Sequence, residues 1–421
     1  MSVRTTILDF SSLSGALGKD RGRVQESVNT AAKEVGGDPV EQARLLASFN
    51  KALGTLHEED KGPGIMSSSK NALASRLQSY LVERALAEQP QAAAPIAGQV
   101  QEVKFDNLDV IGWLPVGLRL IFRPKKFERP DPSGAAVPIA DKLRLGMFAD
   151  WGSGLYGAPK IRESILNDPT PYDMLMHLGD VYYSGSDREV EERLVSMWPV
   201  TGAGHHVALN GNHEMYSGGK PYFTRALSFL NQPQSCVAFQ NANWLLVGLD
   251  TAFVDHDLDD AQVAWLTGLI NAAGSRKVIL FSHHQPFSQL DDQGPKLVQK
   301  LSALLNAQRI HAWFWGHEHR CVIYSPHSTF GFKGRCVGHG GFPAFRDTFN
   351  SPGTNNYEWR MLPANSEAPA AEVLDGPNLF IPGEEARYSP HGYLTLEFDG
   401  ANCLETYFDA ARTVVRPAQP L

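Results

Sequence analysis

The sequence predicts an α/β fold with a helical appendage at its N-terminus. From Leu143 onward, apolar strand-like runs alternate with helical stretches, as in α/β domains whose strands are buried. The first hundred residues instead carry helical periodicity and a Pro/Ala-rich tract. The expected strands cover 143–149, 172–178, 206–210, 244–250, 277–282 and 312–316, and the expected helices lie near 158–167, 187–198, 260–272 and 295–307.

Residues 1–98 are predicted to form a helical region that ends in a linker. Asp38 is a helix-capping residue and Pro39 suits the first helical position. A second helix is expected to start at the serine run 67–69, and the tract 88–98 is too rich in Pro and Ala to continue it. We therefore predict a boundary at 98, followed by a second domain over 99–421. The two apolar stripes consist of Leu46, Phe49, Leu53 and Leu56, and of Leu73, Leu77, Tyr80 and Leu81.

Two further stretches are predicted to be extended. Residues 100–127 are strand-like, and a Pro-rich turn over 129–138 leads into the main domain. Near the end of the chain, 393–398 and 403–408 are predicted to form an antiparallel pair.

Composition argues against several classes of function without excluding nucleic-acid binding by a local basic patch. The 421 residues contain 38 Lys and Arg against 46 Asp and Glu, a formal charge of −8, so binding to nucleic acid or to an anionic membrane is not expected. No apolar run approaches the roughly 20 residues that span a bilayer, and no secretory leader pattern is present. We expect a cytoplasmic protein, and the sequence does not indicate its oligomeric state. Its four cysteines form no CxxC pair and are expected to be reduced: Cys236, Cys321, Cys336 and Cys403.

Each main apolar run is followed by side chains that can ligate a metal. In open α/β folds, ligands bind beyond the carboxyl ends of the strands. A single such Asp or His is more often a turn or capping residue, but five sets in one chain are hard to explain in that way. The sequence therefore predicts one metal site at the strand ends, built from Asp150, Asp180, Asn212-His213, His283-His284, and His317 with His319.

These motifs occur in an order that resembles a known family. D-x-G, GDxxY, GNHE, H-x-P and GHxH follow one another over 143–320. This order resembles the calcineurin-like metallophosphoesterases, and in detail their purple acid phosphatase branch. The resemblance implies two stacked mixed β-sheets flanked by helices, and two metal ions bridged by Asp180. It implies Asp150, Asp180, Tyr183 and His319 as ligands of site one, and Asp180, Asn212, His284 and His317 as ligands of site two.

The chain departs from the common pattern of the wider superfamily at one ligand position. Many members have a His two residues after the first Asp, where this chain has Gly152. The purple acid phosphatase pattern has a Tyr three residues after the second Asp, which is Tyr183 here. Within the histidine pair, His284 fits H-x-P, which leaves His283 as a substrate-binding or supporting group.

The donor set indicates which metals suit the site. Carboxylates, a phenolate and imidazoles without any thiolate favour Fe, Mn or Zn. A phenolate favours Fe(III) at site one, paired with a divalent ion at site two. Such a cluster keeps a net positive charge, which attracts a phosphate dianion.

Two further residues are candidates for handling the substrate. The resemblance directs His213 at the leaving-group oxygen as a general acid or electrostatic stabiliser. A histidine beside a cationic cluster needs a carboxylate to hold its proton, and Glu214 and Asp250 are the candidates. Arg346, on the glycine-rich segment 338–346, is a candidate phosphate ligand, although a surface arginine beside a tight turn is the favoured interpretation.

The predicted function is dinuclear, metal-dependent hydrolysis of phosphoesters. Phosphomonoesterase and phosphodiesterase activities, including cyclic-nucleotide and nuclease types, stay open because the difference lies in pocket walls such as 342–388. A non-catalytic scaffold that binds a partner through the N-terminal helices is the competing class. Competent residues at every ligand position argue against it.

Overall fold

The computed structural model divides the chain into two compact units. One comprises Met1–Lys126 together with Tyr216–Gly218, and the other comprises Phe127–Met215 and Gly219–Leu421. This division groups 99–126 with the N-terminal unit, whereas the linker pattern assigned them to the second domain. The residues that the structure describes are 5–9, 21–35, 39–59, 71–88, 100–104, 117–118, 131–152, 154, 156–201, 204–254, 256–291, 295–346, 356–381, 383 and 385–421.

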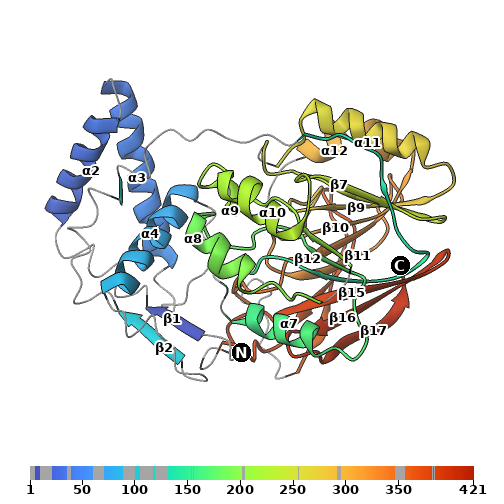
Figure 1. Cartoon of the computed structure of the whole chain (residues 1–421). Helices are drawn as coiled ribbons and strands as arrows, with labels where there is room; N and C mark the ends of the chain where they lie inside the picture. The colour runs from blue at the N-terminus through green and yellow to red at the C-terminus, as the bar shows by residue number, and fades with distance from the viewer. Residues whose placement is uncertain are drawn as a thin grey trace. The chain divides into compact units, whose positions relative to one another are not determined.

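The N-terminal unit contains three helices and a two-stranded parallel sheet. Helix α3 contacts both α2 and α4, and β1 pairs with β2. Helix α4 is capped by Asn71, whose Oδ1 accepts hydrogen bonds from the backbone N–H groups of Leu73 and Ala74 at 3.0 Å each. The elements, drawn in blue in Figure 1, are β1 (Thr5–Asp9), α2 (Arg21–Val35), α3 (Pro39–Glu59), α4 (Ala72–Glu88) and β2 (Val100–Lys104).

The two predicted N-terminal helices are present, and a third was missed. Helix α3 begins at Pro39, as expected. Phe49, Leu77 and Leu81 of the predicted stripes are buried. The expected start of α4 at the serine run 67–69 lies outside the described residues. Helix α2 buries an apolar stripe at spacings of four, seven and eight, which periodicity alone could have found: Val24, Val28, Ala31 and Ala32.

The second unit is built on two mixed β-sheets. The first sheet has six strands in the order β17-β16-β15-β4-β5-β6, with β4, β5 and β6 parallel. The pair β15 and β16 is antiparallel, which confirms the expected closing hairpin. Its strands are β4 (Lys142–Phe148), β5 (Met174–His177), β6 (His205–Ala208), β15 (Gly392–Asp399), β16 (Asn402–Asp409) and β17 (Val414–Pro420).

The second sheet has nine strands in the order β13-β14-β11-β12-β10-β9-β8-β7-β3. Its centre is parallel, because β8, β9, β10 and β12 run in one direction. The strands are β3 (Val137–Pro138), β7 (Val237–Gln240), β8 (Trp244–Gly248), β9 (Lys277–Ser282), β10 (Ile310–Trp315), β11 (Cys321–Tyr324), β12 (Lys333–Val337), β13 (Glu358–Leu362) and β14 (Ala371–Asp375).

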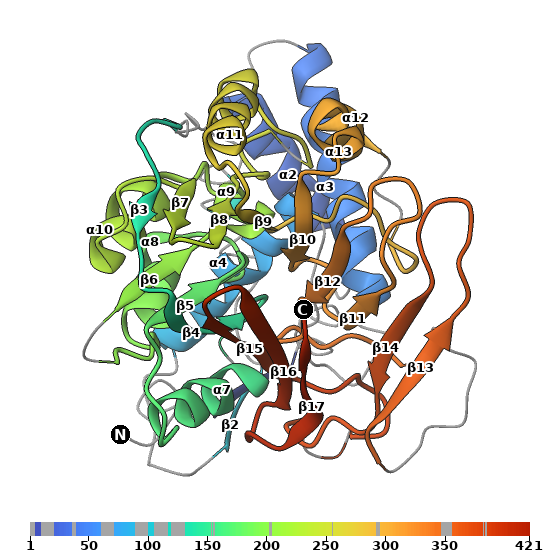
Figure 2. The same ribbon diagram turned by 90° about the vertical axis from the view of Figure 1, so that its right-hand side faces the viewer.

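Helices cover the outer faces of the two sheets. Apolar side chains of both sheets, such as Leu145 and Phe281, pack together between them. Helix α11 covers the nine-stranded sheet and α7 the six-stranded sheet (Figures 1 and 2). Leu266 of α11 and Ile161 of α7 pack in the apolar clusters on these outer faces. The helices are α7 (Gly157–Leu166), α8 (Asp187–Glu189), η1 (Val190–Val195), α9 (Asn212–Met215), η2 (Tyr222–Ala226), α10 (Leu227–Leu230), α11 (Asp260–Ala272), α12 (Lys296–Lys300) and α13 (Ser302–Asn306).

This architecture confirms the predicted α/β sandwich, and the six expected strands are all present within a few residues. The extended segment expected over 100–127 is a strand only at Val100–Lys104; residues 117 and 118 are helical, and the others lie outside the described residues. All four cysteines are buried free thiols. None of the helices that the structure describes is long and apolar enough to cross a lipid bilayer.

Candidate metal centre

Sharp turns at the carboxyl ends of five parallel strands bring the predicted ligands together. Asp150, Asp180, His317 and His319 all adopt a left-handed backbone, with φ of 55°, 56°, 67° and 53°. A non-glycine residue pays for this conformation, and such strain concentrates at functional sites. The turns follow β4, β5 and β10, and those after β6 and β9 carry Asn212 and His283. Both sheets therefore supply donors to one place.

Four donor atoms form the tightest group. His283 Nε2 lies 2.9 Å from Asn212 Oδ1, 3.0 Å from His317 Nδ1 and 3.2 Å from Asp180 Oδ2. His317 Nδ1 lies 2.9 Å from the same Asn212 oxygen. All four side chains are buried.

A second group shares Asp180 with the first. Asp150, Asp180 and His319 each place a donor atom within 4.8 Å of the others, and so do Asp180, His283 and His317. His319 Nε2 lies 3.5 Å from Asp150 Oδ1. One carboxylate is thus common to two adjacent donor groups, as a bridging ligand must be.

The donor chemistry of both groups fits a metal centre. Ligands around a tetrahedral ion with bonds of about 2.0–2.2 Å lie roughly 3.3 Å apart, close to the spacings of the first group. Asp180 Oδ2 is buried and accepts no hydrogen bond from the residues that the structure describes. Burial raises the pKa of Asp180, but the nearby His213 and His283 rings outweigh it, so that the pKa is lowered overall and the carboxylate stays charged.

The geometry favours His283 over His284 as the histidine of the first group, which reverses the preference drawn from H-x-P. His283 Nδ1 lies 3.0 Å from the Leu178 carbonyl, so this nitrogen donates there and Nε2 faces the other donors. His284 instead turns toward Thr251, with 2.9 Å between its Nδ1 and the Thr251 Oγ1. Two adjacent residues after a strand point in different directions, and a linear motif does not record which one faces the site.

Glu214 has a supporting role that the sequence did not reveal. Its buried carboxylate accepts backbone N–H bonds from Asp180 at 2.9 Å, from Val181 at 2.8 Å and from Gly211 at 2.7 Å. It therefore ties the turn after β5 to the turn after β6. A side chain at Gly211 would collide with Asp180 Oδ1 and Glu214, which explains the glycine in GNHE.

His213 lies beside the donor atoms, and the carboxylate near its ring is that of Asp180, whereas the sequence suggested Glu214 or Asp250. Its Nδ1 hydrogen-bonds the Tyr183 carbonyl, and its Nε2 lies 3.6 Å from Asp180 Oδ2. Burial lowers the pKa of His213, although Asp180 opposes the shift. Of the two expected partners, Glu214 accepts the backbone bonds just described, and Asp250 accepts from the Asn210 amide at 3.0 Å and from nearby backbone.

The space beside Gly152, where many superfamily members have a histidine ligand, is occupied by the aromatic ring of Phe342. A Cβ at Gly152 would collide with the ring of Phe342. That ring stacks on His319 with 4.7 Å between centroids, and lies 5.0 Å from His213 and 5.8 Å from Tyr183. Phe342 thus packs against three candidate site residues, a contact that only the fold could reveal. Tyr183 itself is buried, with its ring centroid 5.5 Å from that of His213.

Arg346 is placed differently from the predicted phosphate ligand. It is buried, and its Nε donates to Asp375 Oδ1 at 2.7 Å. Asp375 also pairs with Arg360. This network ties the segment 338–346 and β13 to the end of β14, which favours a structural role for Arg346.

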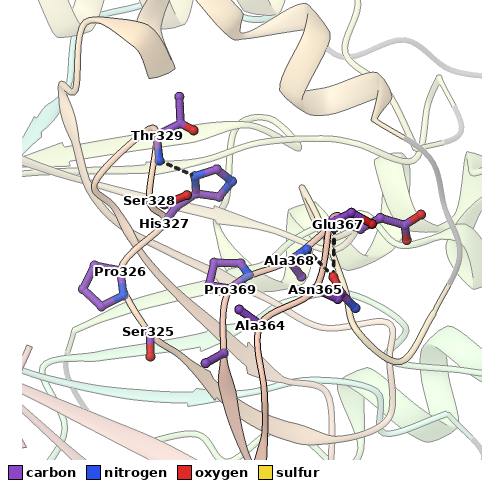
Figure 3. A pocket seen from close by; sticks show the side chains of 12 residues that line it. Ser325, Pro326, His327, Ser328, Thr329, Ala364, Asn365, Glu367, Ala368 and Pro369 are labelled. Carbon is purple, nitrogen blue, oxygen red and sulfur yellow. Dashed lines mark hydrogen bonds between the residues drawn. The ribbon is translucent and has the colours of Figure 1, made fainter.

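A surface pocket elsewhere in the second unit has few of the donor groups that form the candidate metal centre. It has a volume of about 370 Å³ and lies between the turns 325–329 and 364–370 (Figure 3). It follows the end of β11, whereas His319 precedes the start of that strand. Among its lining residues only His327 and Glu367 are common metal ligands, so it does not resemble the centre described above.

One family model matches the part of the chain that holds the site, and several solved structures are similar to the chain. Residues 143–321 match the family model of the calcineurin-like phosphoesterases. No curated protein matches the chain. Among solved structures, it is similar to a purple acid phosphatase from yellow lupin (Lupinus luteus) seeds, at 14% identity over 65% of this chain and 52% of that chain, with a TM-score of 0.48. The chain thus spans about half of the lupin protein.

Two further structures are similar. GAP50, described as the anchor in the inner membrane complex of Plasmodium, is 13% identical over 66% of this chain and 88% of that chain, with a TM-score of 0.47. PhoD is 11% identical over 68% and 69%, with a TM-score of 0.45. Residues 143–321, which hold the buried His/Asp clusters, belong to the calcineurin-like phosphoesterases, a family of hydrolases that act on phosphoester bonds.

Proposed function

We propose that this chain hydrolyses phosphoesters at a dinuclear metal centre bridged by Asp180. The observation that carries the proposal is the membership of Asp180 in both donor groups. When bound, two ions supply Lewis acidity, which activates water and withdraws charge from a phosphoryl group.

Each ion has its own set of ligands in this proposal. Site two comprises Asp180, Asn212, His283 and His317, the four residues whose donor atoms lie closest together. Site one comprises Asp150, Asp180 and His319, with Tyr183 as a fourth ligand in place of the histidine that Gly152 removes. The oxygen and imidazole donors suit Fe, Mn or Zn.

His213 is the residue that would assist the leaving group. Its Nδ1–H donates to the Tyr183 carbonyl, so Nε2 is the nitrogen that can hold and deliver a proton. Nε2 lies on the side of Asp180, whose carboxylate stabilises the protonated ring. The proton would pass from Nε2 to the departing alkoxide oxygen as the ester bond breaks.

A substrate panel on metal-analysed protein tests the function. Protein loaded with Mn, Zn or Fe should hydrolyse p-nitrophenyl phosphate or bis-p-nitrophenyl phosphate, and the ratio of the two rates assigns it to the monoesterases or the diesterases. His213→Gln should keep both ions and lose roughly 10²–10⁴-fold on alkyl phosphates, with a smaller loss on p-nitrophenyl phosphate. No turnover of any phosphoester by the fully loaded protein would favour the scaffold alternative.

The role of Tyr183 has an optical test. A ferric phenolate absorbs visible light by charge transfer, so iron-loaded protein should be coloured, and Tyr183→Phe should remove the band. The neighbouring Tyr182 offers a matched control, since Tyr182→Phe should leave the band in place. A band that survives Tyr183→Phe would refute the phenolate ligand without touching the dinuclear proposal.

A further inference from the structure

A group of three histidines adjoins the proposed dinuclear centre and shares His317 with it. His256, His284 and His317 each place a ring nitrogen within 4.8 Å of the others. The ring centroid of His284 lies 4.0 Å from that of His256 and 4.7 Å from that of His317. Neither His256 nor this grouping is explained by the proposed phosphoester chemistry.

His317 can face two sites because its two nitrogens point in opposite directions. Nδ1 lies with Asn212 and His283, as described above. Nε2 lies 4.0 Å from Asp291 Oδ2, a carboxylate that is partly exposed. One side of the ring is therefore turned to the dinuclear centre and the other to an acidic group.

His284 is oriented so that one nitrogen is directed by a hydroxyl group. Thr251 Oγ1 lies 2.9 Å from His284 Nδ1 and accepts the His284 backbone N–H at 3.1 Å. With Nδ1–H also donating to this oxygen, Nε2 becomes the nitrogen that can ligate a metal. This is the arrangement of a histidine ligand held by a second group.

His256 is the most exposed of the three histidines in this group. It lies on the turn after β8 in a left-handed conformation, with φ of 61°, and its backbone N–H donates to the Thr251 carbonyl at 3.1 Å. Thr251 thus holds both His256 and His284. Because His256 is only partly buried, an ion can reach the group without passing through the dinuclear centre.

We propose that His256, His284 and Nε2 of His317, with Asp291 as a fourth ligand, form a third metal site that takes a zinc-class divalent ion. Three imidazoles and one carboxylate are a common zinc ligand set. Nitrogens that ligate one such ion lie roughly 3.3 Å apart, so the rings would close by about 1–2 Å from their present limit of 4.8 Å.

The charge balance allows a third cation beside two others. A His317 ring that ligates metals through both nitrogens is an imidazolate, and its proton is released to solvent. The imidazolate and Asp291 carry one negative charge each, which together offset one dication. The site depends on His317 but not on whether the dinuclear centre hydrolyses phosphoesters.

Zinc stoichiometry tests the proposal. Metal-free full-length protein is dialysed to equilibrium against zinc, and the zinc bound per chain is measured by mass spectrometry. We expect three ions in the wild type and two in His256→Gln. His327→Gln is the matched control, because His327 is also partly exposed on a turn but lies in the pocket of Figure 3, where it should leave the count at three. Thermal unfolding shows that each variant is folded.

Cobalt loading gives a second readout, because tetrahedral Co²⁺ absorbs visible light strongly. His256→Gln should remove about a third of this absorption when all three sites are tetrahedral. Two zinc ions in both the wild type and His256→Gln would overturn the third site and leave the dinuclear centre standing. A wild-type content below two that still falls in His256→Gln would support the histidine site and contradict the dinuclear centre. Loss of more than one ion in His256→Gln would also overturn a separate third site.

Discussion

The two sheets contribute different chemistry to the proposed centre. The six-stranded sheet supplies the oxygen donors Asp150, Asp180 and Asn212, and the nine-stranded sheet supplies the imidazoles of His283, His317 and His319. The negative charge of the site thus comes from one sheet, and neutral donors come from the other. We infer that changes on the first side alter the charge and bridging of the dinuclear centre, whereas changes on the second side affect one of its two ions at a time.

The ligands from each sheet are oriented by hydrogen-bonding groups from the opposite sheet. The Leu178 carbonyl, after β5, accepts from His283 Nδ1. In return, Asp150 accepts from the His317 backbone N–H, at 3.0 Å to Oδ2. The geometry of the centre is therefore a property of the packed sandwich, and neither sheet carries it alone.

The largest effect is expected from Asp180→Asn, on the oxygen side. The substitution removes the charge shared by both donor groups, so both ions should be lost together and turnover should fall by about 10³-fold or more. Metal analysis and hydrolysis of p-nitrophenyl phosphate check this. Retention of two ions would contradict the bridging role.

The imidazole side is tested by two adjacent substitutions. His283→Asn should lose one ion of the dinuclear centre, since Nε2 of His283 lies within 3.2 Å of three other donors. His284→Asn should keep both of those ions, with most of the activity. Because His284→Asn should also lose the ion of the proposed third site, zinc content alone does not separate the two variants. The rate of p-nitrophenyl phosphate hydrolysis does, since only His283→Asn should lose it. The reverse result would restore the sequence-based choice of His284.

A smaller effect is expected from Glu214→Gln, which alters how the oxygen side is held. The amide keeps one acceptor oxygen for three backbone N–H groups, so the turns after β5 and β6 should loosen. Metal affinity should fall by about 10–100-fold, as is typical when a supporting residue is changed. Glu189→Gln is the control, because the Glu189 carboxylate also accepts backbone N–H hydrogen bonds, in its case from Ser184 and Ser186. Equal losses in the two variants would argue against a specific role for Glu214.

The last prediction concerns stability rather than metal binding, at His391, which is not among the proposed ligands and accepts a hydrogen bond from the Gly157 N–H. Burial lowers the pKa of His391 from 6.5 to about 4. Because the unfolded chain binds the proton more tightly, stability should fall as the pH drops from about 6.5 to 4, by at most about 3 kcal/mol. His391→Asn keeps an acceptor for the Gly157 N–H and should flatten this slope. Chemical unfolding across this pH range measures it, and an unchanged slope would contradict the assignment.

Much of the fold could be read from local patterns. Strands such as β9 and helices such as α11 follow from apolar runs and helical periodicity, because each must bury an apolar face. Helix α2 was missed although its stripe has the same spacing. The order of the sheets and the register of β15 on β4 could not be predicted, because they depend on contacts between residues about 250 positions apart.

By itself, the sequence determined the types of donor and their position after strands, since strand ends and polar motifs are local features. Only the tertiary structure decided which of His283 and His284 faces Asp180, that Arg346 pairs with Asp375, and that Phe342 fills the space beside Gly152. These outcomes depend on side-chain directions at left-handed turns and on segments that are far apart in the chain. A linear motif contains neither, because direction and proximity arise only when the two sheets pack together.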